Sequence, residues 1–125
     1  MKENSDFLDF YRNITFSDNY DVNSFIGKWI DDAIWSDEEY IKLEKSLLTI
    51  QKAYPYPTDI PREIIISLYR IIELMMIPNW LDFDVEKSNL NDESDIFDRF
   101  ERLKLVISYV LSGNDIQEIG FGYNP

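Results

Sequence analysis

The sequence predicts a single all-α domain, residues 1–125, built as a compact bundle of four to five helices around a buried central helix at about 61–76. Two observations lead to this fold class. Apolar residues recur at three- and four-residue spacing in four segments, as they do in a helix with one buried face. No segment of useful length alternates apolar and polar residues like a half-buried strand. A chain of this length can bury roughly two-thirds of its unfolded surface, which is enough for one core.

The first two helices are expected in the N-terminal third of the chain. Residues 7–14 predict a short helix, and apolar residues at helical spacing between Val22 and Ile34 predict a second. Gly27 lies inside this second segment and lowers its helix propensity.

The third helix has the clearest start in the sequence. Ser36 is expected to accept a hydrogen bond from the backbone N–H of Glu39, while the Glu39 side chain reaches back, which forms a capping box. The helix then runs to about Lys52. Two apolar contacts are available to fix its first turn: Ile34 or Trp35 against Tyr40 or Ile41.

Two prolines, at positions 55 and 57, end this helix because they remove backbone donors and fix φ. The fourth helix is expected to start at Pro61, a residue favoured in the first turn, and to run to about Met76. Apolar residues cover most of its circumference, so we expect it to be the buried central helix.

The last helix is expected to begin after Asn91 as its cap and to end at Ser112-Gly113-Asn114. Acidic residues four positions before two arginines predict ion pairs on its outer face: Asp95 with Arg99 and Asp98 with Arg102. No helix or strand is predicted for the tail after Asp115.

The composition argues against most catalytic chemistry. The chain has no histidine and no cysteine, so it lacks an imidazole base or ligand and a thiolate. No cofactor and no metal site are expected. Asp82, Asp84, Glu86 and Glu93 share the spacing of a calcium loop, but Lys87 stands where that loop needs glycine. We therefore expect a binding protein, and the alternative from another class is a small hydrolase that uses carboxylates alone.

The charge indicates what kind of partner to expect. The chain carries 24 acidic and 12 basic residues, a formal net charge of -12, and a pI of about 4.2. Such a domain repels phosphate, so direct nucleic-acid binding is not expected, whereas a basic protein is attracted. Residues 1–40 carry -7 (10 acids, 3 bases), residues 41–80 carry +1 (4 and 5), and residues 81–125 carry -6 (10 and 4). The sequence shows neither the pattern of a signal peptide nor that of a membrane span, so we expect a cytoplasmic protein.

Aromatic residues at helix ends, beside acidic residues, are the candidate contacts for that partner. Trp and Tyr dominate the hot spots of protein interfaces. A proline-rich turn is expected to display Tyr54 and Tyr56 at low entropic cost, so we rank them first among the candidate partner contacts. Trp35 ranks next. The predicted partner-binding residues are Trp35, Asp37, Glu38, Tyr54, Tyr56, Asp59, Asp82 and Asp84.

Four stretches also follow one another in a particular order: Ile34-Trp35-Ser36-Asp37-Glu38-Glu39-Tyr40 with Lys42-Leu43-Glu44; Tyr54-Pro55; Ile60-Pro61-Arg62-Glu63-Ile64 with Tyr69-Arg70-Ile71; and Asn89-Leu90 with Phe97-Asp98-Arg99-Phe100-Glu101-Arg102 and Leu105-Val106. Together they resemble the bacterial immunity proteins of polymorphic-toxin systems, including contact-dependent growth inhibition, over roughly residues 34 to 112.

This resemblance implies a small cytosolic protein without catalysis, which binds and neutralises the C-terminal domain of a cognate toxin, in many cases a basic nuclease. Four motif positions are expected to serve helix packing or ion pairing: Arg62, Glu63, Arg99 and Arg102. The alternative is an acidic regulator that mimics nucleic acid and occupies the groove of a DNA- or RNA-binding protein. The sequence leaves the oligomeric state open.

Overall fold

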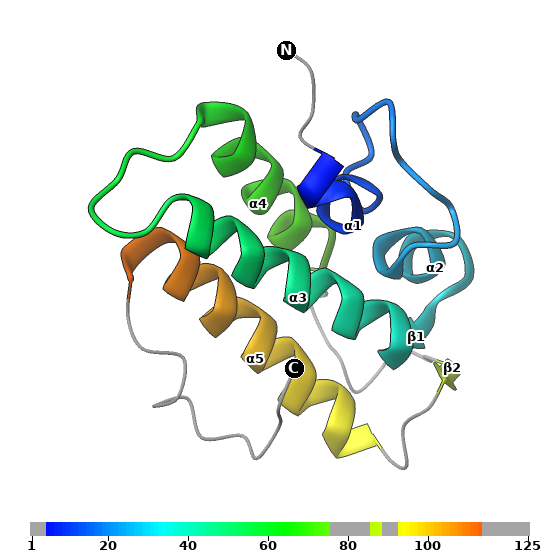
Figure 1. The fold of residues 1–125 in the computed structure, drawn as a ribbon. Coiled ribbons are helices and arrows are strands. Elements are labelled where there is room, and N and C mark those ends of the chain that lie inside the picture. Colours follow the sequence, from blue (N-terminus) through cyan, green and yellow to red (C-terminus); the bar gives the residue numbers. More distant parts are fainter. Residues whose placement is uncertain (1–4, 76–85, 89–92, 114–125) are drawn as a thin grey trace.

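Helix α3 (Asp37–Ala53) lies in the middle of the protein and contacts α1, α2, α5 and both short strands. The structure is a computed structural model that describes residues 5–75, 86–88 and 93–113 (Figure 1). The other elements, in chain order, are η1 (Ser5–Phe7), α1 (Leu8–Tyr11), α2 (Phe25–Asp32), β1 (Ile34–Ser36), α4 (Arg62–Met75), β2 (Glu86–Ser88) and α5 (Glu93–Ser112). The mainly-α fold class is confirmed.

The predicted central helix is present as α4, but the central position belongs to α3. One side of α4 is buried in the core, through Ile64, Leu68, Ile71 and Met75. Its other side leaves Ile65, Ile66 and Tyr69 exposed, at 43%, 58% and 68%. An apolar pattern reports how much apolar surface a helix carries, and it does not fix how many neighbours cover that surface. The expectation of burial all round was therefore wrong.

The start of α3 agrees with the sequence. The Ser36 hydroxyl accepts a hydrogen bond from the Glu39 N–H at 3.3 Å, and the rings of Trp35 and Tyr40 lie 5.7 Å apart. Among the described residues, the Glu39 carboxylate contacts Arg12 and Lys42 rather than closing the capping box. The residues before the cap, Ile34–Ser36, form β1, which pairs in parallel with β2. Strands of three residues are too short to show an alternating pattern, so this pairing was not expected.

Helix α2 begins at a serine cap and is shorter than predicted. The Ser24 hydroxyl accepts the N–H of Gly27 at 3.1 Å. The helix ends at Ala33, whose φ of 54° is left-handed, so Ile34 leaves the helix and enters β1. The short helix predicted at residues 7–14 is present as η1 and α1, over residues 5–11.

Four aromatic rings fill the space between α2, β1 and α3. The rings of Phe25 and Trp35 meet edge to face at 4.8 Å, and those of Trp29 and Trp35 at 5.9 Å. Tyr40 completes the group at 5.5 Å from Phe25. The Trp29 indole N–H donates to the carbonyl of Leu74 at 3.3 Å, which ties α4 to this part of the core. Edge-to-face contacts of this kind add to the free energy gained by burial.

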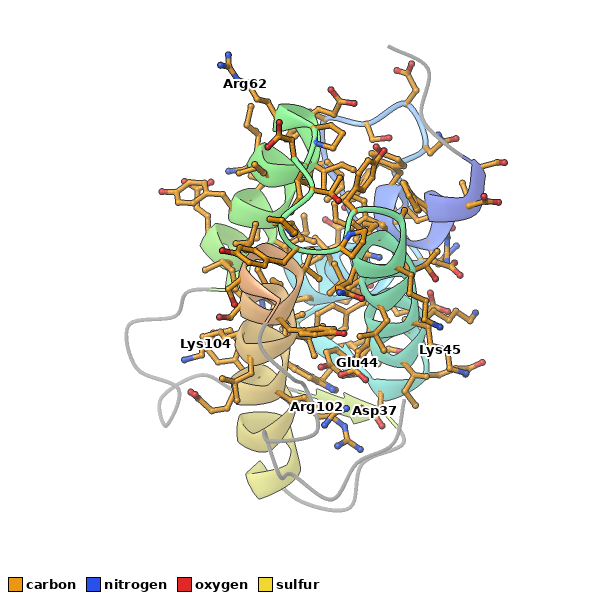
Figure 2. The ribbon with its side chains drawn as sticks, turned by 60° about the vertical axis from the view of Figure 1, so that its left-hand side comes forward. Asp37, Glu44, Lys45, Arg62, Arg102 and Lys104 are labelled. Carbon is orange, nitrogen blue, oxygen red and sulfur yellow. The ribbon has the colours of Figure 1, made fainter. Side chains whose placement is uncertain are left out.

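Two ion pairs join α3 to α5. Arg99 Nε lies 2.9 Å from a carboxylate oxygen of Asp37, and Arg102 Nε lies 2.7 Å from one of Glu44. Figure 2 shows Glu44 and Arg102 between the two helices. The ion-pair role expected for both arginines is confirmed. The outer-face position expected for Arg102 was wrong, because Arg102 is only 4% exposed.

The predicted local partners of these arginines, Asp95 and Asp98, have side chains outside the described part of the structure.

At the other end of α5, Gly113 has a φ of 77° and its N–H donates to the Tyr109 carbonyl, which confirms the predicted cap. Asn91, the predicted cap at the start, lies outside the described residues. None of the helices in the described ranges is long and apolar enough to span a membrane.

Candidate partner-binding surface

The structure divides the predicted partner-binding residues between the two ends of α3. Residues 35–38 precede or open the helix, and residues 54–59 follow it. Glu38 and Tyr54 are separated by sixteen helical steps, which places their backbones about 24 Å apart. The other two predicted residues, Asp82 and Asp84, lie outside the described residues. The sequence prediction therefore covers two separate surfaces.

At the start of α3, only one of the three predicted residues is exposed. Trp35 is 0% exposed within the aromatic cluster, and Asp37 is 6% exposed in its ion pair with Arg99. Glu38 alone is exposed. The expectation that Trp35 is displayed at the surface was wrong, because its ring serves as the apolar cover of the first turn of α3.

The residues that follow α3 lie together in one cavity of about 240 Å³, which we call the tyrosine groove. Its walls come from the α3–α4 connection, the first turn of α4 and the last turn of α5. Its lining residues are Tyr54, Tyr56, Pro57, Thr58, Asp59, Ile60, Ile65, Val110 and Leu111. Three of the eight predicted partner-binding residues are thus brought to a single site.

The chain builds this groove with a short turn that is supported from behind. The Thr58 N–H donates to the Pro55 carbonyl at 2.6 Å, which closes the turn. Tyr54 is half-buried, with its ring 6.2 Å from that of Phe7, whereas Tyr56 is 71% exposed. A Cβ on Gly113 would lie 2.6 Å from Tyr56 Cβ. The end of α5 can therefore approach Tyr56 this closely only because residue 113 is glycine.

Sequence reasoning missed the two aliphatic residues of the groove that are most open to solvent. Ile65 and Leu111 are 43% and 45% exposed. Both lie on helices whose apolar residues were assigned to the core. A signal was present for Ile65, since α4 has more apolar positions than one buried face requires.

Three exposed acidic residues lie on the other side of the described structure from the tyrosine groove. Asp18, Asp31 and Asp32 are exposed on α2 and the segment before it, which Figure 1 shows on the other side of the molecule from the α3–α4 connection. Burial, together with the charges of Asp31 and Asp21, raises the pKa of Tyr20. A hydrogen bond from the Asn23 backbone N–H, assisted by Arg12, holds the pKa of Asp21 below its usual value.

Arg12 is the cation that organises this side of the protein. Its guanidinium contacts Asp9 and Asp21 at 3.0 Å and Glu39 at 3.1 Å, so it joins α1, the segment before α2, and α3. The hydrogen bond and charge of Glu39 also raise the pKa of Lys42. Within the described ranges, no group of three or more acidic, histidine or cysteine side chains is placed to hold a metal ion.

The fold and these surfaces define a class of protein: a small mainly-α domain with a groove lined by Tyr54 and Tyr56 at one end. A family model described as Immunity protein 41 matches residues 12–122, and the chain belongs to this family. No curated protein and no solved structure gives a significant match. The resemblance to toxin-immunity proteins is confirmed, and the match extends beyond residues 34–112 on both sides. The protein is thus an immunity protein of a bacterial toxin system, whose role is to bind and neutralise a cognate toxin.

Proposed function

We propose that this immunity protein neutralises its toxin by direct binding, without catalysing a reaction, and that the tyrosine groove receives part of the toxin. One observation carries the proposal: Tyr54, Tyr56 and Asp59, predicted independently from the sequence, line the same cavity. Its volume of about 240 Å³ lies below the roughly 300–1,000 Å³ of typical small-molecule sites. A cavity of this size suits one or two anchoring side chains of a protein partner.

The groove offers both an apolar and a charged contact. Tyr56 is 71% exposed on a turn that two prolines stiffen, so little conformational entropy is lost when a partner covers it. Ile65 and Leu111 provide apolar walls, and Asp59 provides an exposed carboxylate. This combination fits a toxin segment with an apolar or aromatic side chain next to a lysine or arginine.

The charge of the whole chain supports a basic partner, a nuclease domain at the C-terminus of the toxin that the protein meets in the cytoplasm. A net charge of -12 steers a basic domain toward the protein and raises the association rate at low salt. Glu38, Asp82 and Asp84 belong to this proposal as carboxylates that attract the toxin. Asp37 and Trp35 contribute by holding the start of α3 in place.

The test uses the toxin domain encoded next to the immunity gene. We expect co-expression of the immunity protein to rescue cells from this domain, and the purified proteins to bind in a 1:1 complex whose association slows as salt rises. Tyr56→Ala should weaken the complex at least about 30-fold, as expected for a hot spot. Asp59→Lys should slow association and flatten the dependence on salt.

Phe16→Ala is the matched control, since it removes a comparably exposed aromatic ring (59%) that lies outside the groove. We expect this variant to bind the toxin as the wild type does. Failure of the wild type to bind or rescue would reject toxin neutralisation itself. Wild-type affinity in both Tyr56→Ala and Asp59→Lys would reject the tyrosine groove as the binding site.

A further inference from the structure

Helix α4 presents an ordered row of side chains to solvent, which we call the α4 stripe: Arg62, Ile66, Tyr69 and Glu73. At 3.6 residues per turn these positions fall within an arc of about 60°. The buried residues of the helix, Ile64, Leu68, Ile71 and Met75, lie on the opposite side. Ile66 is 58% exposed and Tyr69 is 68% exposed. A stripe with alternating spacings of four and three residues is the pattern by which one helix packs along another.

The two ends of the α4 stripe carry opposite charges. Arg62 is exposed at the start of the helix, forms no ion pair with the described residues, and projects away from the protein in Figure 2. Glu73 is exposed near the other end, where it pairs with Arg70 of its own helix. Glu73 is eleven positions after Arg62, so the two charges stand about 16 Å apart along the axis.

This arrangement is complementary to itself. If a second α4 lies antiparallel, with a two-fold axis between Ile66 and Tyr69, each Arg62 faces the Glu73 of the other copy. In the same register each Ile66 faces a Tyr69. Such a match, in which each residue contacts the other member of its pair across the axis, is the property of a two-fold interface.

The distribution of charge favours the same face. Two copies with a net charge of -12 repel each other, yet residues 41–80, which include α4, carry only +1 (4 acids and 5 bases). Helix α4 itself carries two acidic and two basic residues, so two α4 stripes can meet without net repulsion between them. We propose that the α4 stripe binds a second copy of this chain, as an antiparallel pair of α4 helices.

The size of the stripe sets the strength of this contact. Two apolar side chains per copy, with one charge at each end, bury much less than the roughly 800 Å² per partner of a standard interface. The dimer is therefore weak. The protein is expected to be monomeric in dilute solution and dimeric at high concentration. Because Arg62–Glu73 contacts lie at the edge of the interface, the association also weakens as salt rises.

The test is analytical ultracentrifugation of the full chain from micromolar to millimolar concentration. We expect the wild type to shift from monomer to dimer, and Ile66→Glu to abolish the shift. Arg62→Glu and Glu73→Arg should each weaken the dimer at least tenfold, because each sets two like charges opposite each other. The double variant Arg62→Glu/Glu73→Arg restores opposite charges and should recover the dimer. Lys52→Glu, which makes the same charge change at an exposed position outside the stripe, is the control.

Circular dichroism and thermal melting would first establish that each variant is folded. A wild type that stays monomeric throughout overturns the proposal. So does a double variant that remains as weakened as the single ones, because the two charges then do not face each other. If the toxin complex protects α4 from hydrogen exchange, and Ile66→Glu weakens toxin binding while the free protein stays monomeric, the toxin is the occupant and the proposal is overturned.

Discussion

Glu44 and Arg102 are charged residues buried between α3 and α5, with side chains 0% and 5% exposed. Two arginine nitrogens donate to the Glu44 carboxylate, and the Tyr40 hydroxyl donates to it at 2.9 Å. Removing either ion from water costs several kcal/mol, and only a well-formed pair with further hydrogen bonds offsets this cost. Each residue is therefore tolerated because the other is present.

Breaking this pair should be far more damaging than replacing it. Arg102→Met leaves a buried carboxylate without its cation and should lower the free energy of unfolding by about 3–5 kcal/mol. The double variant Glu44→Leu/Arg102→Met removes both charges and should recover most of that loss. Urea denaturation measures both values. Lys104→Met, which breaks the exposed pair with Glu101, is the control and should change stability little. A double variant no more stable than Arg102→Met would contradict this account.

At the scale of the element, α2 shows how packing overrides helix propensity. Gly27 lowers the propensity of the helix, yet its missing side chain lets the preceding segment approach. A Cβ at this position would lie 2.4 Å from the Val22 carbonyl oxygen and 2.7 Å from that of Asp21. Both contacts are with backbone, which cannot rotate aside as a side chain can. The conformation of the 21–22 segment thus depends on glycine in α2.

We therefore expect Gly27→Ala to destabilise the protein. Helix propensity alone predicts a gain of about 1 kcal/mol for this change. The clash with backbone should outweigh this gain and lower the free energy of unfolding by about 1–3 kcal/mol, the usual cost of overpacking. Asp31→Ala, at an exposed position of the same helix, controls for propensity. Thermal and urea unfolding decide the sign, and a more stable Gly27→Ala variant would mean that the 21–22 segment moves freely away from α2.

At the scale of the whole molecule, the dominant feature is the net charge of -12. Like charges repel one another more in the folded state than in the extended chain, so the charge works against folding. Salt screens this repulsion, and it also weakens the exposed ion pairs. The repulsion involves many more charges than those pairs, and it should dominate.

The melting temperature should consequently rise by several degrees as sodium chloride increases from a few millimolar to physiological strength. Differential scanning calorimetry at fixed pH measures this rise. The variant Asp31→Asn/Asp32→Asn lowers the net negative charge, so its melting temperature should rise less with salt. A melting temperature that falls with salt would indicate that the exposed ion pairs, among them Arg70–Glu73 and Lys104–Glu101, outweigh the net repulsion.

Local signals in the sequence located much of the fold and part of the site. The Ser36 cap, Pro61 and Gly113 marked helix ends that the structure confirms, because each acts on its own neighbouring backbone. The proline-rich turn likewise predicted exposed tyrosines, and the structure shows Tyr56 exposed and Tyr54 half-buried. What the sequence missed depends on distant contacts. Arg102, for instance, reaches a glutamate 58 positions away.

The sequence by itself determined the helical class, several helix boundaries, the net charge, and the resemblance to toxin-immunity proteins. These properties are either local or summed over the chain. Only the tertiary structure decided which apolar residues are buried. It placed Trp35 inside the core, and left Tyr56 and the apolar residues of the α4 stripe exposed. The physical reason is that helical periodicity defines the faces of a helix, whereas the burial of a face depends on which other elements pack against it.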